Sequence, residues 1–185
     1  MSLFPSHDRR LVRRGMDFGY TNDPTTITDI YEYNGGYILD ERLYNYGMSN
    51  KLIAETLLSF QDPNCLVVAD SAEPKSIDEI KMYGVNIIGA VKGSGSINTG
   101  IAFVQSQPIS YTKRSKNIKK EYENYVWLED KEGNSLNVPK PMYDHAMDGI
   151  RYAFSTLIME DDSEVIDDPS LLDDEPTPLY SDIGL

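Results

Sequence analysis

Short apolar and β-prone runs separated by turn-forming residues fill the first part of the chain, a pattern that predicts strands. Three such runs follow one another, around residues 16–20, 26–33 and 37–44. In the second run, Ile27, Tyr31 and Tyr33 share one face by period-two spacing. Asp29 interrupts that face. Between the second and third runs, Asn34-Gly35-Gly36 is a strong hairpin signal, because these residues tolerate positive φ. We therefore expect an antiparallel β-meander.

Helical and strand-like segments alternate after the meander. Ser49 is a suitable N-cap for a helix on which Ile53 and Leu57 lie one turn apart on the apolar face. The almost wholly apolar run Cys65–Ala69 predicts a buried strand. The remaining segments are, in order, a helix at 76–82, a strand at 85–90, a helix at 98–105, a strand at 109–112, a helix at 115–122, a hairpin built from 125–128 and 135–138, and a final helix after Pro141. This order predicts an α/β fold.

The final helix has two distinct faces. Its apolar stripe consists of Ala146, Ile150, Ala153 and Leu157. Its polar face carries Asp144, Asp148, Arg151 and Ser155. By spacing alone, such a polar face is more often solvated than catalytic. Asp144 can either cap the helix or support a site on this face.

Acidic residues are concentrated at the C-terminus. The chain has 185 residues and a formal net charge of −13, but residues 160–185 hold ten Asp or Glu and no Lys or Arg. The preceding part is nearly neutral, with twenty acidic and seventeen basic side chains, so basic patches there can still attract phosphate. Prolines and weak periodicity predict that the tail is disordered or depends on a partner. Its simplest role is that of a solvated extension.

A chain of this length builds one domain with a sizeable core. Residues 1–12 carry no core pattern and are predicted to be an N-terminal extension, residues 13–159 form the domain, and residues 160–185 are the acidic tail. The single cysteine, Cys65, lies in an apolar run and cannot form an internal disulfide, which favours a buried thiol in a reducing cytoplasm. No run approaches the roughly 20 apolar residues that cross a bilayer, and no signal-peptide core adjoins the charged N-terminus. Neither secretion nor a membrane location is expected.

Three aspartates occupy positions where distant parts of the chain can converge on one cluster of negative charge. Asp17 lies in the segment Gly15–Tyr20, Asp70 follows the apolar run directly, and Asp148 lies in the final helical pattern. Closely spaced carboxylates repel one another, and hard divalent cations such as Mg2+ or Mn2+ relieve that repulsion. Structural alternatives exist, since Asp17 can occupy a strand-end turn and Asp70 can cap a strand end.

Further motifs accompany the aspartates, namely Asp23-Pro24-Thr25-Thr26, residues 70–77, residues 90–97, residues 115–118 and residues 144–148. Together they resemble the nuclease domain of the large terminase subunit of tailed bacteriophages, an RNase H-like endonuclease that cuts concatemeric DNA during genome packaging. The resemblance runs from about Gly15 to Ile158. It implies an RNase H-like α/β fold in which a mixed central sheet, made of an antiparallel meander and parallel strands, is flanked by helices.

The resemblance also implies a metal-dependent endonuclease that acts on double-stranded viral DNA. Asp17, Asp70 and Asp148 match the family's metal-binding aspartates, and the expected cofactors are two Mg2+ or Mn2+ ions. Two such ions, about 4 Å apart, would clamp the scissile phosphate, one activating water and the other stabilising the leaving 3′ oxygen. His145 matches the family's histidine and either positions water, ligates weakly or is an ordinary helix residue.

Contacts to DNA are expected from basic side chains outside this cluster. Lys92 lies beside Gly93 and Gly95 and can reach a backbone phosphate. The densest internal basic run consists of Lys113, Arg114, Lys116, Lys119 and Lys120. Such a run is either a solvated face or a contact surface for DNA. By resemblance, the hairpin at 127–138 regulates access to the site. No recognition helix is evident, which favours contact through phosphates with little base specificity.

Large terminases join an ATPase to the nuclease, so the resemblance implies an excised C-terminal part. The chain lacks a Gly-x-x-x-x-Gly-Lys-Ser/Thr phosphate loop. Implied partners are double-stranded DNA, the terminase ATPase domain, the small terminase subunit and the portal protein, in the cytoplasm of an infected or lysogenic bacterium. Three alternatives remain open: another RNase H-like nuclease such as a resolvase, a kinase or ATPase using Asp17 in a phosphate-binding turn, and a non-enzymatic interaction module of the packaging motor.

Overall fold

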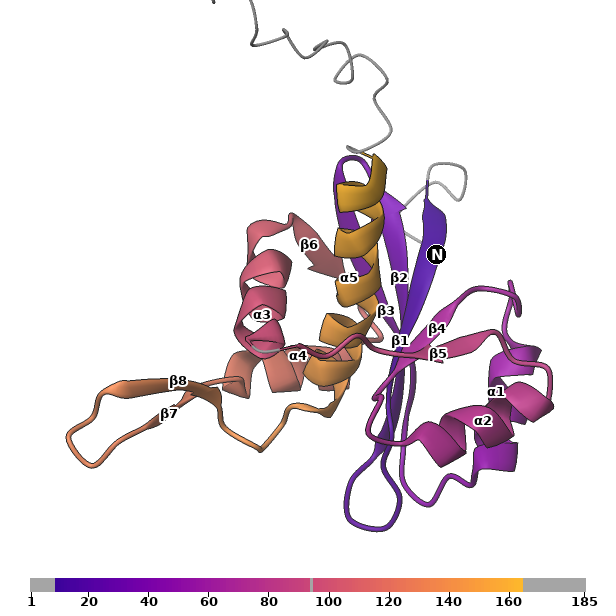
Figure 1. Ribbon diagram of the computed structural model, residues 1–185, viewed down its shortest axis with the longest axis horizontal. Helices are drawn as coiled ribbons and strands as arrows, with labels where there is room; N and C mark the ends of the chain where they lie inside the picture. Colours follow the sequence, from indigo (N-terminus) through magenta and orange to yellow (C-terminus); the bar gives the residue numbers. More distant parts are fainter. Residues whose placement is uncertain (1–8, 94, 165–185) are drawn as a thin grey trace, which may run out of the picture.

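A mixed six-stranded sheet forms the centre of the computed structural model, which describes residues 9–93 and 95–164 (Figure 1). The strands are β1 (Arg10–Asp17), β2 (Thr25–Tyr33), β3 (Gly36–Asn45), β4 (Val67–Ala69), β5 (Ile87–Gly89) and β6 (Ile109–Tyr111), in the spatial order β5-β4-β1-β2-β3-β6. β1, β2 and β3 form the antiparallel meander, whereas β4, β5 and β6 join it by parallel pairing. The predicted mixed sheet is confirmed.

Helices cover both faces of this sheet (Figure 1). They are α1 (Asn50–Ser59), α2 (Pro74–Met82), α3 (Ser96–Ser106), α4 (Lys116–Asn124) and α5 (His145–Glu164). α1 and α2 pack on one face, and α3, α4 and α5 lie over the other. Within the described ranges, no helix is both long enough and apolar enough to cross a membrane.

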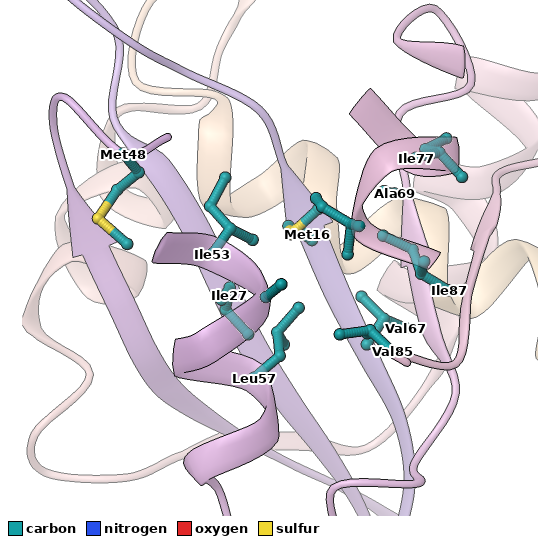
Figure 2. Close-up of a cluster of buried hydrophobic side chains, with 12 residues drawn as sticks. Met16, Ile27, Met48, Ile53, Leu57, Val67, Ala69, Ile77, Val85 and Ile87 are labelled. Carbon is teal, nitrogen blue, oxygen red and sulfur yellow. The ribbon is translucent and has the colours of Figure 1, made fainter. Parts of the chain in front are cut away.

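The core beneath α1 and α2 is aliphatic (Figure 2). Met16 and Ile27, neighbours on β1 and β2, meet Ile53 and Leu57 of α1 in this layer, and all four are almost fully buried. Full burial of an aliphatic side chain stabilises the fold by about 1.5–3 kcal/mol. The layer therefore anchors β1, whose last residue is Asp17, from one side of the sheet.

The core on the opposite face is built around α5. Ala146, Ile150 and Ala153 of the predicted apolar stripe are buried there, and Leu157 packs at the edge. Phe154 is also fully buried, in an edge-to-face contact of 4.8 Å between ring centroids with Tyr37. This face holds the N-terminal half of α5 firmly against the sheet.

Two glycines allow α5 to lie directly on β1. A Cβ atom added to Gly15 would lie 2.1 Å from the carbonyl oxygen of Gly149, a distance no side chain tolerates. A Cβ atom at Gly149 would lie 3.3 Å from the backbone nitrogen of Asp17. Because backbone meets backbone here, Asp148 at the start of α5 is brought beside the end of β1.

Local signals in the sequence place several boundaries correctly. The Ser49 side chain accepts a hydrogen bond from the backbone N–H of Leu52, which confirms it as the N-cap of α1. Asn34 and Gly35 have φ values of 50° and 74°, which confirms the hairpin turn between β2 and β3. The second predicted hairpin is also present, as β7 (Trp127–Glu129) and β8 (Ser135–Pro139), and it projects from the body of the domain (Figure 1).

The ends of the domain differ from the sequence prediction. β1 starts at Arg10 rather than near residue 16, because its backbone pairs with β2 from Arg10, opposite Glu32, onward. The strand therefore includes part of the predicted extension at 1–12 and ends at Asp17 rather than at residue 20. α5 continues to Glu164, past the expected boundary at 159. Residues 1–8 and the tail prediction for 165–185 lie outside the described residues.

Candidate active site

The three candidate aspartates come from three separate elements that meet at one end of the sheet. β1 and β4 are parallel neighbours with Met16 opposite Ala69, so Asp17 and Asp70 leave adjacent strands at their carboxyl ends. Ligand sites in α/β sheets commonly lie at this edge. Asp148 joins them from the first turn of α5.

Asp17 is the most buried of the three, with 13% of its side chain exposed. Burial raises its pKa to about 6, and the negative charges of Asp148 and Asp70 add to this effect, although a hydrogen bond with His145 opposes it. A cation bound next to the Asp17 carboxylate would therefore be electrostatically favourable.

His145 supplies positive charge next to Asp17. Its Nδ1 lies 3.1 Å from Asp17 Oδ2, and its Nε2 lies 3.5 Å from Asp23 Oδ1. The hydrogen bond to Asp17 is the main cause that raises the pKa of His145 to about 9, against the opposing effect of burial. At neutral pH the ring is therefore an imidazolium that donates toward these carboxylates.

Asp70 is paired with a lysine. Its Oδ1 forms an ion pair with Lys92 and accepts a hydrogen bond of 2.8 Å from the backbone N–H of Ala72. Although burial acts in the opposite direction, these contacts hold the pKa of Asp70 below its usual value. This placement is consistent with both alternatives for Asp70, a cap at the end of the strand and a residue of the site.

Asp148 faces two residues of its own helix. Arg151 Nη2 lies 3.0 Å from Asp148 Oδ1, and the Tyr152 hydroxyl donates to Oδ2 over 3.4 Å. The arginine stem in turn packs on α3, where a Cβ atom at Gly100 would lie 2.8 Å from Arg151 Cγ. The first turns of α5 are therefore fixed on both sides.

The chain itself thus provides a cation for every aspartate of the group. Asp17 faces His145, Asp70 faces Lys92 and Asp148 faces Arg151. Among the side chains that the structure describes, within residues 9–93 and 95–158, no three His, Cys, Asp or Glu stand close enough together to hold a metal ion as they are. The three carboxylates are nevertheless close enough for their charges to raise the pKa of Tyr152 together, and carboxylate oxygens are the ligands that hard divalent cations prefer.

Comparison with known proteins assigns the family. The model of the "Terminase RNAseH like domain" family matches residues 17–156, a range that begins at Asp17 and includes Asp70 and Asp148.

The chain belongs to this family.

Its relatives are large terminase subunits. The large subunit of Bacillus phage SPP1 is 33% identical over 150 residues, covering 77% of this chain and 35% of the relative. The large subunit of the PBSX phage of Bacillus subtilis is 30% identical over 172 residues, covering 85% of this chain and 36% of the relative. The chain spans about a third of the length of these curated relatives.

Solved structures agree with this assignment. The nuclease domain of the SPP1 large terminase, crystallised with bound Mn, superposes with a TM-score of 0.71 at 27% identity, covering 84% of this chain and 93% of that one. The nuclease domain of the P22 large terminase shares 13% identity and the fold, with a TM-score of 0.64 over 84% of each chain. The RNase H-like fold is therefore confirmed.

Two residues of this terminase RNase H-like domain were missed by sequence reasoning. Burial raises the pKa of Tyr152, and the charges of Asp148, Asp17 and Asp70 raise it further, which places its hydroxyl among all three carboxylates. Its position four residues after Asp148 was the available signal. Glu121 of α4 was missed because it acts from a different element.

Glu121 caps the helix that carries His145 and Asp148. Its buried carboxylate accepts hydrogen bonds from the backbone N–H groups of Ala146, at 2.7 Å, and Met147, at 3.1 Å. Free N–H groups at a helix start favour a negative partner. Asp144 immediately precedes the helix, and its backbone carbonyl accepts from the N–H of Asp148. A carboxylate from α4 therefore takes the capping role that was one of the two alternatives for Asp144.

The predicted basic residues of the terminase domain fall into two groups. Lys92 reaches Asp70, and Lys120 lies over the ring of Tyr143, with its Nζ 4.8 Å from the ring centroid. Lys92 therefore lies at the three aspartates, and Lys120 lies in a cleft that His145 also lines. The others are exposed without reaching the three aspartates: Lys113 and Lys116 on the surface, Arg114 in an ion pair with Asp40, and Lys119 in an ion pair with Glu123.

A cleft of about 570 Å³ opens beside the aspartates. Lys92, Asp148 and Arg151 line one side of it, and Val138 and Pro139 of the β7–β8 hairpin line another. Trp127, on the partner strand of the hairpin, is half-buried. The hairpin therefore borders the approach to Asp148.

Proposed function

We propose that this domain is the nuclease of a phage large terminase, an endonuclease that hydrolyses phosphodiester bonds of double-stranded viral DNA concatemers during packaging. The observation that carries the proposal is the meeting of Asp17, Asp70 and Asp148 from three distant segments at one sheet edge. The family match over the same segments supports it.

Asp17, Asp70 and Asp148 are the proposed ligands of Mg2+ or Mn2+, with two ions per site. When bound, such ions activate water and stabilise the leaving oxygen. The Mn carried by the SPP1 nuclease domain supports this choice of metal. Burial raises the pKa of Asp17, repulsion from Asp148 and Asp70 adds to this effect, and a bound cation would offset both.

The chain's own cations have a second role in this proposal. Lys92 leaves 41% of its side chain exposed and lines the cleft together with Arg151. Once Asp70 and Asp148 are neutralised by metal, both cations can contact a DNA phosphate through charge-assisted hydrogen bonds. His145 holds a ring proton between Asp17 and Asp23 and is the proposed positioning group for water.

The wider setting is also part of the proposal. The domain acts in the cytoplasm of the bacterial host, together with the terminase ATPase domain, the small subunit and the portal protein. The matched region of its relatives is about a third of their length, which leaves ample chain in them for other domains. Among the basic residues, Lys113, Lys116 and Lys119 are proposed as weaker phosphate contacts on the outer face of the domain.

Plasmid cleavage tests the activity. Supercoiled DNA should be converted to nicked and linear forms in Mn2+ or Mg2+ and remain intact in EDTA, and protein carrying Asp148→Asn, purified in parallel, should leave it intact. Cleavage that persists in EDTA would overturn metal dependence. If no cleavage occurs with either ion, the interaction-module alternative gains support. Faster cutting of a four-way junction than of duplex would favour a resolvase, and ATP hydrolysis would favour the kinase or ATPase alternative.

A further inference from the structure

A second cleft, of about 470 Å³, is lined by His145, the partner of Asp17, and shares no lining residue with the first. Its volume lies in the range of about 300–1,000 Å³ that is typical of small-ligand pockets. Residues that decide its chemistry are Tyr46, Lys120, Tyr143, Asp23, Asp144 and His145. His145 belongs to this cleft and also contacts Asp17, so a molecule bound here would lie next to the aspartates.

Two exposed tyrosines line this second cleft. Tyr46 is 53% exposed and Tyr143 is 37% exposed, although both are large and partly apolar. Lys120 lies over the Tyr143 ring, which places a positive charge against one ring face. Exposed aromatic side chains interleaved with lysine are the usual platform for the bases of an unpaired strand.

The backbone conformation of Tyr143 is unusual for a tyrosine and supports a binding role for this residue. Its φ is 60°, in the left-handed region that bulky residues rarely adopt and that Gly or Asn would occupy more easily. Backbone strain of this kind persists at binding sites where the surrounding structure holds it in place. Tyr143 is two residues before His145, so the conformation aims an aromatic ring into the cleft directly beside the site.

The charges of the second cleft select between a phosphate and a base. Asp23 and Asp144 line it together with Lys120 and His145, so the cleft has no excess of cationic over acidic side chains. The cleft therefore offers a phosphate no net electrostatic attraction. A nucleobase is neutral, and its exocyclic amino groups can donate to carboxylates, as cytosine does to Asp or Glu. The first cleft has an excess of positive side chains, since Lys92 and Arg151 line it against the single carboxylate of Asp148.

We propose that the second cleft receives an unpaired nucleobase of the DNA strand that is cut, stacked on Tyr143 and Tyr46. The phosphate of the same strand then lies toward Lys92 and Arg151. This inference rests on the proposed nuclease function and adds a preference to it: the domain favours DNA that is locally unpaired at the cut site.

Binding measurements in EDTA test this inference without requiring cleavage. Fluorescence anisotropy would compare a fully paired duplex, the same duplex with one unpaired nucleotide, and a third ligand in which that nucleotide is abasic. The wild-type domain should bind the unpaired base about tenfold more tightly than the abasic ligand, because base–aromatic stacking is lost while the phosphate remains.

Two variants and a matched control sharpen this test. Tyr143→Asn removes the ring but keeps a residue that tolerates positive φ, and Tyr46→Ser removes the second ring from an exposed position. Each should bring the unpaired-base ligand to within about twofold of the abasic one. Tyr111→Ser, an equally exposed tyrosine on β6, should keep the preference. Circular dichroism melting verifies the fold of each variant.

The results separate this inference from the proposed function. Equal binding of the base-containing and abasic ligands by wild type would overturn the nucleobase cleft, even if Mn2+-dependent plasmid cleavage is observed. An unchanged preference in both tyrosine variants would also overturn it. The third outcome is a wild-type domain that does not cleave plasmid but keeps a tyrosine-dependent preference for the unpaired base. This outcome would overturn the nuclease proposal and leave the cleft as a nucleic-acid binding site.

Discussion

Two groups of carboxylates lie on the same sheet and differ in how their charge is balanced. Asp29 and Asp40 face each other on β2 and β3, where like charges directly opposite one another destabilise a sheet. Asp29 is fully buried and accepts from Arg14 Nε at 2.7 Å and Arg42 Nη1 at 2.8 Å. Asp40 pairs with Arg114. Each carboxylate of this first group has a guanidinium partner: Arg14 and Arg42 lie on neighbouring strands, and Arg114 lies in the loop after β6.

The partners of that group are themselves fixed. Arg14 has no exposed surface and also donates to the backbone carbonyls of Gln61, at 2.6 Å, and Asp62, at 2.8 Å. Arg42 additionally lies 4.4 Å from the ring centroid of Phe60. No other cation can replace these arginines without breaking several contacts. Asp29 and Asp40 are therefore structural, although their sequence context is as acidic as that of a site.

In the second group, the cations beside Asp17 and Asp70 are more replaceable than Arg14, whereas Arg151 beside Asp148 has only 9% of its side chain exposed. Lys92 is 41% exposed, and the His145 ring is 23% exposed. A divalent ion can displace such partners at modest cost, because their charges return to water. The comparison teaches that a cluster of carboxylates becomes a candidate site when its counter-charges can be exchanged.

The largest expected effect is on cleavage. Asp17→Asn, Asp70→Asn and Asp148→Asn should each reduce plasmid cleavage by at least about 100-fold, since each removes a proposed metal ligand. Melting temperatures should stay close to wild type, because few packing atoms change. Asp78→Asn on the exposed face of α2 is the control. Full activity in any one of the three variants removes that residue from the site, and His145→Ala should show a smaller defect.

Breaking the first group should act on stability. Asp29→Ala leaves Arg14 and Arg42 buried without their shared carboxylate, so the free energy of unfolding should fall by about 3–5 kcal/mol. Urea denaturation followed by circular dichroism measures this change, with Asp17→Asn as the comparison from the other group. A loss below about 1 kcal/mol would show that the two groups contribute similarly to the free energy of unfolding.

Replacing an exchangeable cation should have a milder result. Lys92→Met should change the free energy of unfolding by less than about 1 kcal/mol, because its ion pair is partly exposed. The slope of log binding constant against log salt for DNA should fall by about one. Lys75→Met, an exposed lysine of α2, should leave that slope unchanged. An unaltered slope for Lys92→Met would remove this lysine from the DNA contact.

The acidic tail provides a third set of carboxylates and the smallest expected effect. Residues 165–185 contain six acidic residues and no Lys or Arg, so their removal should reduce repulsion of DNA. Cleavage should rise about twofold near about 20 mM salt and stay constant above about 200 mM, where the Debye length is below roughly 10 Å. A loss of cleavage that does not depend on salt would show that the tail supports the domain.

Local chemistry made much of the fold predictable. The Asn34–Gly35 turn, the Ser49 cap and the apolar stripe through Ile150 all depend on residues that are neighbours in sequence or on one helix face. The sequence shows that Asp29 interrupts one face of its strand. It does not show how a carboxylate is accommodated at that position. The explanation is Arg14 on the adjacent strand, a partner that strand periodicity does not reveal.

The sequence by itself determined the order and type of the elements, the family motifs and the identity of the candidate aspartates, because these depend on short-range patterns and residue chemistry. Only the tertiary structure decided how they combine. Gly15 against Gly149 brings Asp148 to β1, and Glu121 caps its helix from α4. Tyr152 takes its place among the carboxylates through the same packing. Such contacts join residues far apart in the chain, and their geometry follows from how helices and strands pack.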